Sequence, residues 1–94
     1  MTSGNRELRR LELESLKNLG PVGSRQLHAV GIETVEQLQQ AGPVRAFQLV
    51  ADMFPSETSV TFLYAVQGAL LDVPLNQVSK KDRERLRDEM RGAA

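Results

Sequence analysis

The 94-residue sequence contains no cysteine, and its aromatic side chains are limited to one tyrosine and three phenylalanines. The lack of cysteine excludes a disulfide framework and any zinc site built on thiolates. No apolar run flanked by a charged start and a small-residue cleavage site occurs near the N-terminus. We therefore expect no secretion signal and a cytoplasmic protein.

The sequence also lacks an excess of either charge, because its twelve Lys and Arg residues are balanced in number by twelve Asp and Glu residues. The charges are unevenly distributed along the chain. Residues 18–79 carry two basic and five acidic side chains, whereas residues 80–94 carry six basic and four acidic ones. A nucleic-acid-binding domain usually shows a basic stripe, and the middle of this chain has none. The signs alternate in residues 80–85, which we interpret as a solvated helix face.

Catalytic motifs are scarce as well. The single histidine, His28, follows Ser24 by one helical turn, a spacing that could place a hydroxyl beside an imidazole. A serine nucleophile would also need an orienting acid and an oxyanion site, and the sequence signals neither. The alternative is a surface or half-buried histidine. Carboxylates occur singly, and no phosphate-binding glycine loop or metal-ligand cluster is present. We predict no enzyme activity, no cofactor and no metal.

The most apolar stretch covers residues 60–73, with the sequence VTFLYAVQGALLDV. A helix of this composition must be covered on nearly all sides, so we expect it to be the central helix of the fold. Roughly 20 apolar residues are needed to cross a bilayer, which makes a membrane span improbable for so short a run. Its polar positions Thr61, Tyr64 and Gly68 follow a spacing of three and four residues and share one narrow strip.

Turn and capping signals divide the rest of the chain into short helices. Pro21 begins a helix that ends at Gly31, Thr34 and Gln37 form a capping box, and Gly42 with Pro43 ends one helix and starts the next. We predict helices from Arg6 and Thr34, and over residues 21–30, 43–54 and 80–90. The fold class is thus all-α, a compact bundle of five to six short helices around a central apolar helix at about Val60–Leu71. Residues 6–91 form one domain, with disordered ends at 1–5 and 92–94.

The stretch from Leu16 to Leu38, LKNLGPVGSRQLHAVGIETVEQL, resembles a helix-hairpin-helix or SAM-like unit. In such a unit, a tight turn between helices presents backbone N–H groups to a nucleic-acid phosphate. Asn18 stands where the first glycine of the hairpin is expected, and Val22 stands where a basic residue is common. The resemblance implies a candidate DNA-contacting set of Lys17, Asn18, Gly20, Gly23, Ser24 and Arg25.

Over a longer range the chain resembles the C-terminal domain of the TfoX/Sxy competence regulators. The matching motifs, in order, are Asn18-Leu19-Gly20-Pro21, Gly31-Ile32, Thr34-Val35, Gly42 with Ala46-Phe47, and Leu63-Tyr64-Ala65 with Gly68-Ala69-Leu70. Gln67 occupies a position where family members often carry glutamate, and Leu75 one where many have tryptophan. The resemblance implies a compact helical bundle, a bacterial origin, a free-standing form of this domain and a role in competence or transcription regulation.

Two functional hypotheses remain open at this stage. In the first, the domain binds a regulatory protein or a part of the transcription machinery, using an exposed strip near Tyr64, Gln67 and Gly68 or the terminal helix. In the second, the turn over residues 18–24 binds the DNA backbone weakly and without sequence preference. A homodimer formed by exchange of the last helix is a further possibility.

Overall fold

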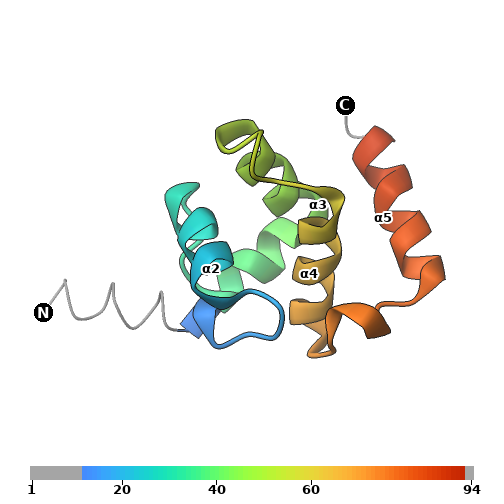
Figure 1. Ribbon diagram of the computed structural model, residues 1–94, viewed down its shortest axis with the longest axis horizontal. Coiled ribbons are helices and arrows are strands. Elements are labelled where there is room, and N and C mark those ends of the chain that lie inside the picture. Colours follow the sequence, from blue (N-terminus) through green and yellow to red (C-terminus); the bar gives the residue numbers. More distant parts are fainter. Residues whose placement is uncertain (1–11, 93–94) are drawn as a thin grey trace, which may run out of the picture.

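The computed structural model describes residues 12–92, and every regular element in that range is helical (Figure 1). The elements are α2 (Gly20–Ala29), α3 (Val35–Met53), α4 (Val60–Leu71), the 3-10 turn η1 (Leu75–Gln77) and α5 (Lys80–Gly92). A short helical stretch at residues 12–14 precedes α2. The all-α bundle is therefore confirmed. The predictions for residues 1–5, for the helix start at Arg6 and for residues 93–94 lie outside the described residues, and Gly92 belongs to α5 instead of a tail.

Helix α4 is the central element, as its composition predicts. It lies between α5 on one side and α2 with α3 on the other (Figure 1). Leu63 packs with Val44 and Leu86, which joins α4 to α3 and α5. Val66 and Ala69 belong to a second apolar cluster that covers α4 from the α2 side, with Leu13, Leu19, Leu27, Ile32, Leu38, Ala46 and Val50. The middle of the helix is thus enclosed by two clusters of buried side chains, whereas Val60 and Leu71 at its ends are exposed.

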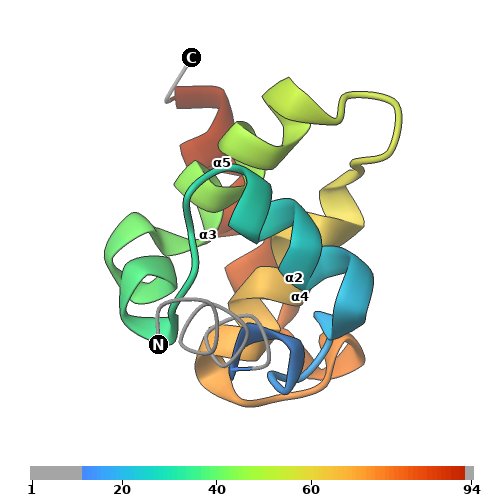
Figure 2. The ribbon, with the colours of Figure 1, turned by 90° about the vertical axis from the view of Figure 1, so that its left-hand side faces the viewer.

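Helix α2 crosses in front of α4 when the molecule is viewed from the left-hand side of Figure 1 (Figure 2). Its end has the geometry of a Schellman motif. The Ile32 N–H donates to the Leu27 carbonyl at 2.9 Å, and the Gly31 N–H donates to the His28 carbonyl at 3.1 Å. Gly31 has a φ of 89°, the left-handed conformation that this motif requires. The predicted stop at Gly31 is confirmed.

Helix α3 begins with the predicted capping box and bends where the sequence places a break. The Gln37 N–H donates to Thr34 Oγ1 at 3.1 Å, and the Thr34 N–H donates to Gln37 Oε1 at 3.2 Å. Gly42 is non-helical, with φ 79° and ψ 166°, and Pro43 follows it. The two helices predicted here are consequently the two halves of α3, joined at a glycine-dependent kink.

The chain leaves α4 through Asp72, which has a φ of 58°, and passes through η1 to α5. Ser79 Oγ accepts a hydrogen bond from the Asp82 N–H at 3.1 Å, so the predicted cap of the last helix is present. Val78 and Leu86 are buried and hold this segment against the core. No helix within residues 12–92 is both long and apolar enough to span a membrane.

Candidate functional site

The turn ahead of α2 and the first half of α2 carry the residues suggested for DNA binding. Lys17 is exposed in the turn, and Arg25 is exposed on α2. Between them the backbone takes positive φ values at Asn18 (73°) and Gly20 (61°). Asparagine is among the few residues that tolerate this left-handed conformation, which is how Asn18 replaces the glycine expected in a hairpin turn.

The side chain of Asn18 ties this turn to the end of α4. Its Nδ2 donates to the Val73 carbonyl oxygen at 3.0 Å and to the Ala65 carbonyl oxygen at 3.4 Å. Its Oδ1 accepts from the Leu75 N–H at 2.8 Å. Gly68 allows the approach, since a Cβ at that position would lie 2.5 Å from Nδ2. The side-chain amide of Asn18 is therefore engaged within the fold and is not presented to a phosphate.

Two further members of the DNA-contacting set face inward. Ser24 is fully buried, and Gly23 is buried where a Cβ would lie 3.5 Å from the ring of Phe62. Their burial, where α2 packs against Phe62 of α4, counts against a direct contact of these two residues with DNA. Lys17 and Arg25 remain the exposed cations of the set, and Gly20 is half-buried.

The histidine has no catalytic surroundings in the described part of the chain. His28 Nε2 lies 3.8 Å from a carboxylate oxygen of Glu33, and both side chains are partly exposed. Ser24, one turn earlier, is fully buried, so a substrate cannot reach its hydroxyl. Within residues 12–92, no group of three or more histidine, cysteine or carboxylate side chains could hold a metal ion.

The strip on α4 that the sequence suggests for protein binding is only partly exposed. Gln67 is 8% exposed and Gly68 is buried under Asn18, Val73 and Val78. Their expected exposure was wrong, because the turn before α2 and the segment after α4 close over that part of the helix. Tyr64 is half-buried, so of the three residues it is the one with a side chain partly exposed to solvent.

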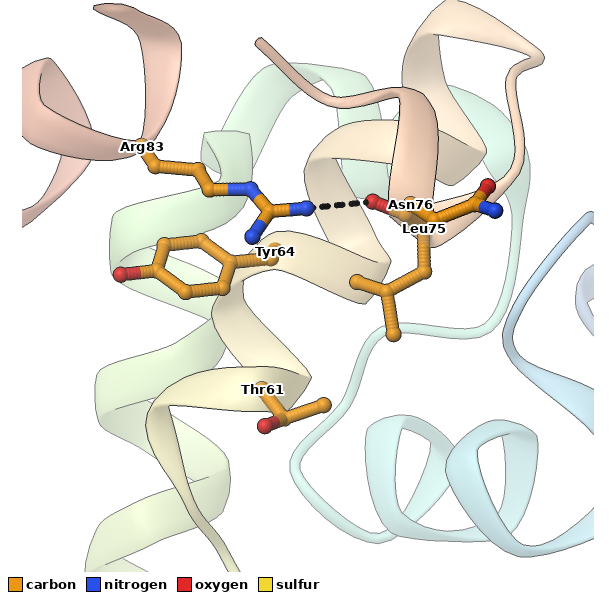
Figure 3. A pocket seen from close by; sticks show the side chains of 5 residues that line it. All are labelled: Thr61, Tyr64, Leu75, Asn76 and Arg83. Carbon is orange, nitrogen blue, oxygen red and sulfur yellow. Dashed lines mark hydrogen bonds between the residues drawn. The ribbon is translucent and has the colours of Figure 1, made fainter. Parts of the chain in front are cut away.

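Tyr64 lines an open hollow of about 460 Å³ where α4, η1 and α5 meet (Figure 3). Thr61 and Tyr64 come from α4, Leu75 and Asn76 from η1, and Arg83 from α5. The hollow thus combines apolar surface from a leucine and an aromatic ring with a hydroxyl, an amide and a guanidinium. Within residues 12–92, these three elements supply all of its lining.

Arg83 is held firmly at the edge of this hollow. Its Nε donates to the Val78 carbonyl oxygen and its Nη2 to the Leu75 carbonyl oxygen, both at 3.0 Å. Its guanidinium carbon lies 5.2 Å from the centroid of the Tyr64 ring, within the range of a cation–π contact. Figure 3 shows the guanidinium above the tyrosine, with its bond to the backbone of η1 dashed. The charge is therefore fixed in position before any partner arrives.

The guanidinium keeps donors to spare. An arginine side chain has more N–H groups than the two carbonyls use. Among residues 12–92, Arg83 forms no ion pair with a carboxylate, and its Nη1 has no hydrogen-bond partner. Nη1 and Nη2, which form the terminal fork, can thus each donate one hydrogen bond to an anion such as a carboxylate, which would accept both.

Sequence reasoning missed Arg83, Leu75 and Asn76 as site residues. Arg83 lies within a run of alternating charges that is typical of a solvated face, and nothing in the run distinguishes it from Arg85. The spacing of Thr61 and Tyr64 did predict that these two lining residues share one strip of α4. The neighbouring polar Asn76 and apolar Leu75, in the turn after α4, could have been recognised as an extension of the surface that begins at this strip.

Comparison with known proteins identifies one matching family and one solved structure with a similar fold. A model of the family described as the TfoX C-terminal domain matches residues 9–90. A crystal structure of an uncharacterized protein from Listeria monocytogenes is similar, with a TM-score of 0.77 and 25% sequence identity, over 86% of this chain and 91% of that chain. No curated protein matches the chain at a significant level.

Proposed function

This chain belongs to the TfoX C-terminal domain family, and from that premise we propose that it is a non-catalytic regulatory domain whose hollow binds a partner protein. The family points to a competence-related regulatory role. The proposed partner is a cytoplasmic regulatory protein or a component of the transcription machinery. The hollow bounded by α4, η1 and α5 is the proposed docking site.

The observation that carries this proposal is the arrangement of Arg83 over Tyr64 beside Leu75. Tyrosine and arginine are the residue types that dominate binding energy at protein interfaces, especially in preformed depressions. Both side chains are already fixed here, so little conformational entropy is lost when a partner binds. A concave, mostly apolar site with a few fixed polar groups is also the usual form of a recognition pocket.

Binding of DNA through the turn at residues 17–25 has weaker support. Gly23 and Ser24 are buried and the Asn18 side chain is engaged, which leaves Lys17 and Arg25 as surface cations. With about two phosphate contacts, the logarithm of the affinity would change with the logarithm of salt by a slope of only about −2. We therefore favour protein binding, and DNA binding through this turn would be detected as a DNA adduct in a crosslinking experiment.

Photo-crosslinking in the native host tests the proposal. A photoreactive amino acid is placed at Thr61, inside the hollow, and in a second variant at Arg25, on the α2 side. We expect a single protein adduct from position 61 and only background from position 25. The adduct must disappear when Arg83→Gln is added and persist with Arg85→Gln, a matched change on the same helix.

Three outcomes of the same crosslinking experiment would contradict the proposal. An adduct with protein or DNA from position 25, with none from position 61, would place the binding surface on α2 and the turn ahead of it. A position-61 adduct of twice the chain mass would identify a second copy of this chain, which would contradict a distinct regulatory partner. Loss of the adduct with Arg85→Gln as well as Arg83→Gln would show that the hollow is not the docking site.

A further inference from the structure

We infer that the hollow recognises an acidic segment of the partner, in which an apolar side chain enters the hollow and a neighbouring carboxylate binds Arg83. The inference rests on the proposed function, because it states the chemistry of the partner at the same site. The apolar component follows from the lining. Leu75 and the Tyr64 ring provide its apolar surface, and its volume of about 460 Å³ lies in the range of about 300–1,000 Å³ typical of ligand pockets.

The acidic component follows from the distribution of charge on α5. Lys80, Arg83 and Arg87 are separated by three and four residues, so they share one side of the helix. None of the three makes an ion pair with a carboxylate in the part of the chain that the structure describes. Lys80 and Arg87 are exposed and flank Arg83, which extends the positive surface along the helix from the hollow.

Other basic side chains of α5 are neutralised internally. Arg85 lies 2.9 Å from a carboxylate oxygen of Glu89 and 3.7 Å from one of Asp82. Arg91 follows Arg87 by four residues and so lies on the same side as Arg87, where it pairs with Asp88. Four basic residues of α5 make no ion pair in the described part of the chain: Lys80, Arg83 and Arg87 lie on the side next to the hollow, and Lys81 lies outside that side. A partner with carboxylates would complement the first three.

A peptide carboxylate suits this surface better than a nucleic-acid phosphate. Glu84 borders the same side of α5 between Lys80 and Arg87, and its negative charge opposes a continuous phosphate backbone. With about three phosphate contacts, nucleic-acid affinity at physiological salt would be poor. A segment that alternates apolar and acidic side chains can instead fill the hollow and reach the fork of Arg83 while leaving Glu84 in solvent.

A binding measurement with defined peptides tests the inference. The probe is a fluorescein-labelled peptide, acetylated and amidated at its ends, in which single leucines are flanked by glutamates and aspartates. The control peptide has the same sequence with glutamine and asparagine in place of the acids. Fluorescence anisotropy with the full chain at low and at physiological salt gives both affinities. Because charge-assisted bonds are among the stronger ones, we expect the acidic peptide to bind about tenfold more tightly or better.

Variants assign the effect to individual side chains. We expect Arg83→Gln to weaken binding of the acidic peptide about tenfold, since the fixed fork is lost. Arg87→Gln removes an exposed charge without internal contacts, so it should weaken binding only about two- to fourfold. Arg85→Gln is the matched control and should change nothing. Circular dichroism verifies the fold of each variant, and if Arg83→Gln unfolds, Arg87→Gln alone decides the question.

The inference is overturned if the acidic peptide and its amide counterpart bind equally, or if Arg85→Gln has the effect expected of Arg87→Gln. A labelled DNA duplex that binds more tightly than the peptide, and loses affinity with Arg87→Gln, would assign the surface to nucleic acid instead. The proposed function fails separately: a crosslink at position 61 that depends on Arg83, without any preference for acidic peptides, would leave the docking site intact and refute only its chemistry.

Discussion

Replacing Gly68 with alanine perturbs a place where α4 and the turn before α2 are in close contact. A Cβ added at this position would lie 2.5 Å from Asn18 Nδ2, 2.8 Å from the Val73 carbonyl oxygen and 3.3 Å from Val78 Cγ2. Real Cβ atoms do not approach other heavy atoms to less than 3.0 Å. The Asn18 side chain must therefore move, and the chain after α4 must shift with it.

The expected cost follows from the contacts that would be lost. Displacing Asn18 breaks its bonds to Val73 and Leu75, each of which contributes about 0.5–1.5 kcal/mol net. Forcing a methyl group into packed surroundings costs about 1–3 kcal/mol more, whereas the better helix propensity of alanine returns about 1 kcal/mol. We expect Gly68→Ala to lower the free energy of unfolding by about 1–5 kcal/mol, against the roughly 5–14 kcal/mol expected for a domain of this size.

Urea denaturation followed by circular dichroism measures this loss, with Gly92→Ala as the control. Gly92 is also helical, and a Cβ there would meet nothing within 4 Å, so its replacement should leave stability unchanged or slightly higher. Adding Asn18→Gly to Gly68→Ala should recover part of the loss by removing the contact with Nδ2. If Gly68→Ala is as stable as Gly92→Ala, the close contact of Gly68 with Asn18 and Val73 does not contribute to stability as we propose.

Three further substitutions test the fold around the site. Gly42→Ala should lose about 1–3 kcal/mol in the same assay, because φ 79° with ψ 166° is a conformation that alanine rarely adopts; an unchanged midpoint would contradict the kink. Thr34→Ala should lose about 1 kcal/mol through the capping box, and Thr34→Ser should retain most of it. Leu63→Ala should lose about 2–5 kcal/mol from the cluster shared with Val44 and Leu86, so a loss below that of Thr34→Ala would show that α4 is not enclosed.

The helices could be predicted because their signals are local. A run of apolar residues defined α4 to its ends, Thr34 with Gln37 marked the start of α3, and Gly42 with Pro43 marked its kink. Each signal acts within a few residues of itself, so a single sequence contains all the information that it needs. The enclosure of α4 follows in turn from its composition.

The site could be predicted only in part, because it depends on contacts between distant segments. Asn18 binds the backbone of Val73, 55 residues away, and that contact is what covers Gly68. Arg83 becomes distinct from Arg85 only when α5 is placed against α4, where one guanidinium lies over Tyr64 and the other remains among carboxylates. Neither relation leaves a trace in local spacing or composition.

Nuclear magnetic resonance tests most directly whether the hollow is the docking site. Two-dimensional ¹H–¹⁵N spectra of the labelled chain are recorded with and without the partner protein recovered by crosslinking. The account predicts shifts or broadening at residues 61–64, 75–76 and 83–87, centred on the side-chain Nε–H of Arg83, with residues 17–25 unchanged. Changes confined to residues 17–25, with the hollow silent, would contradict it.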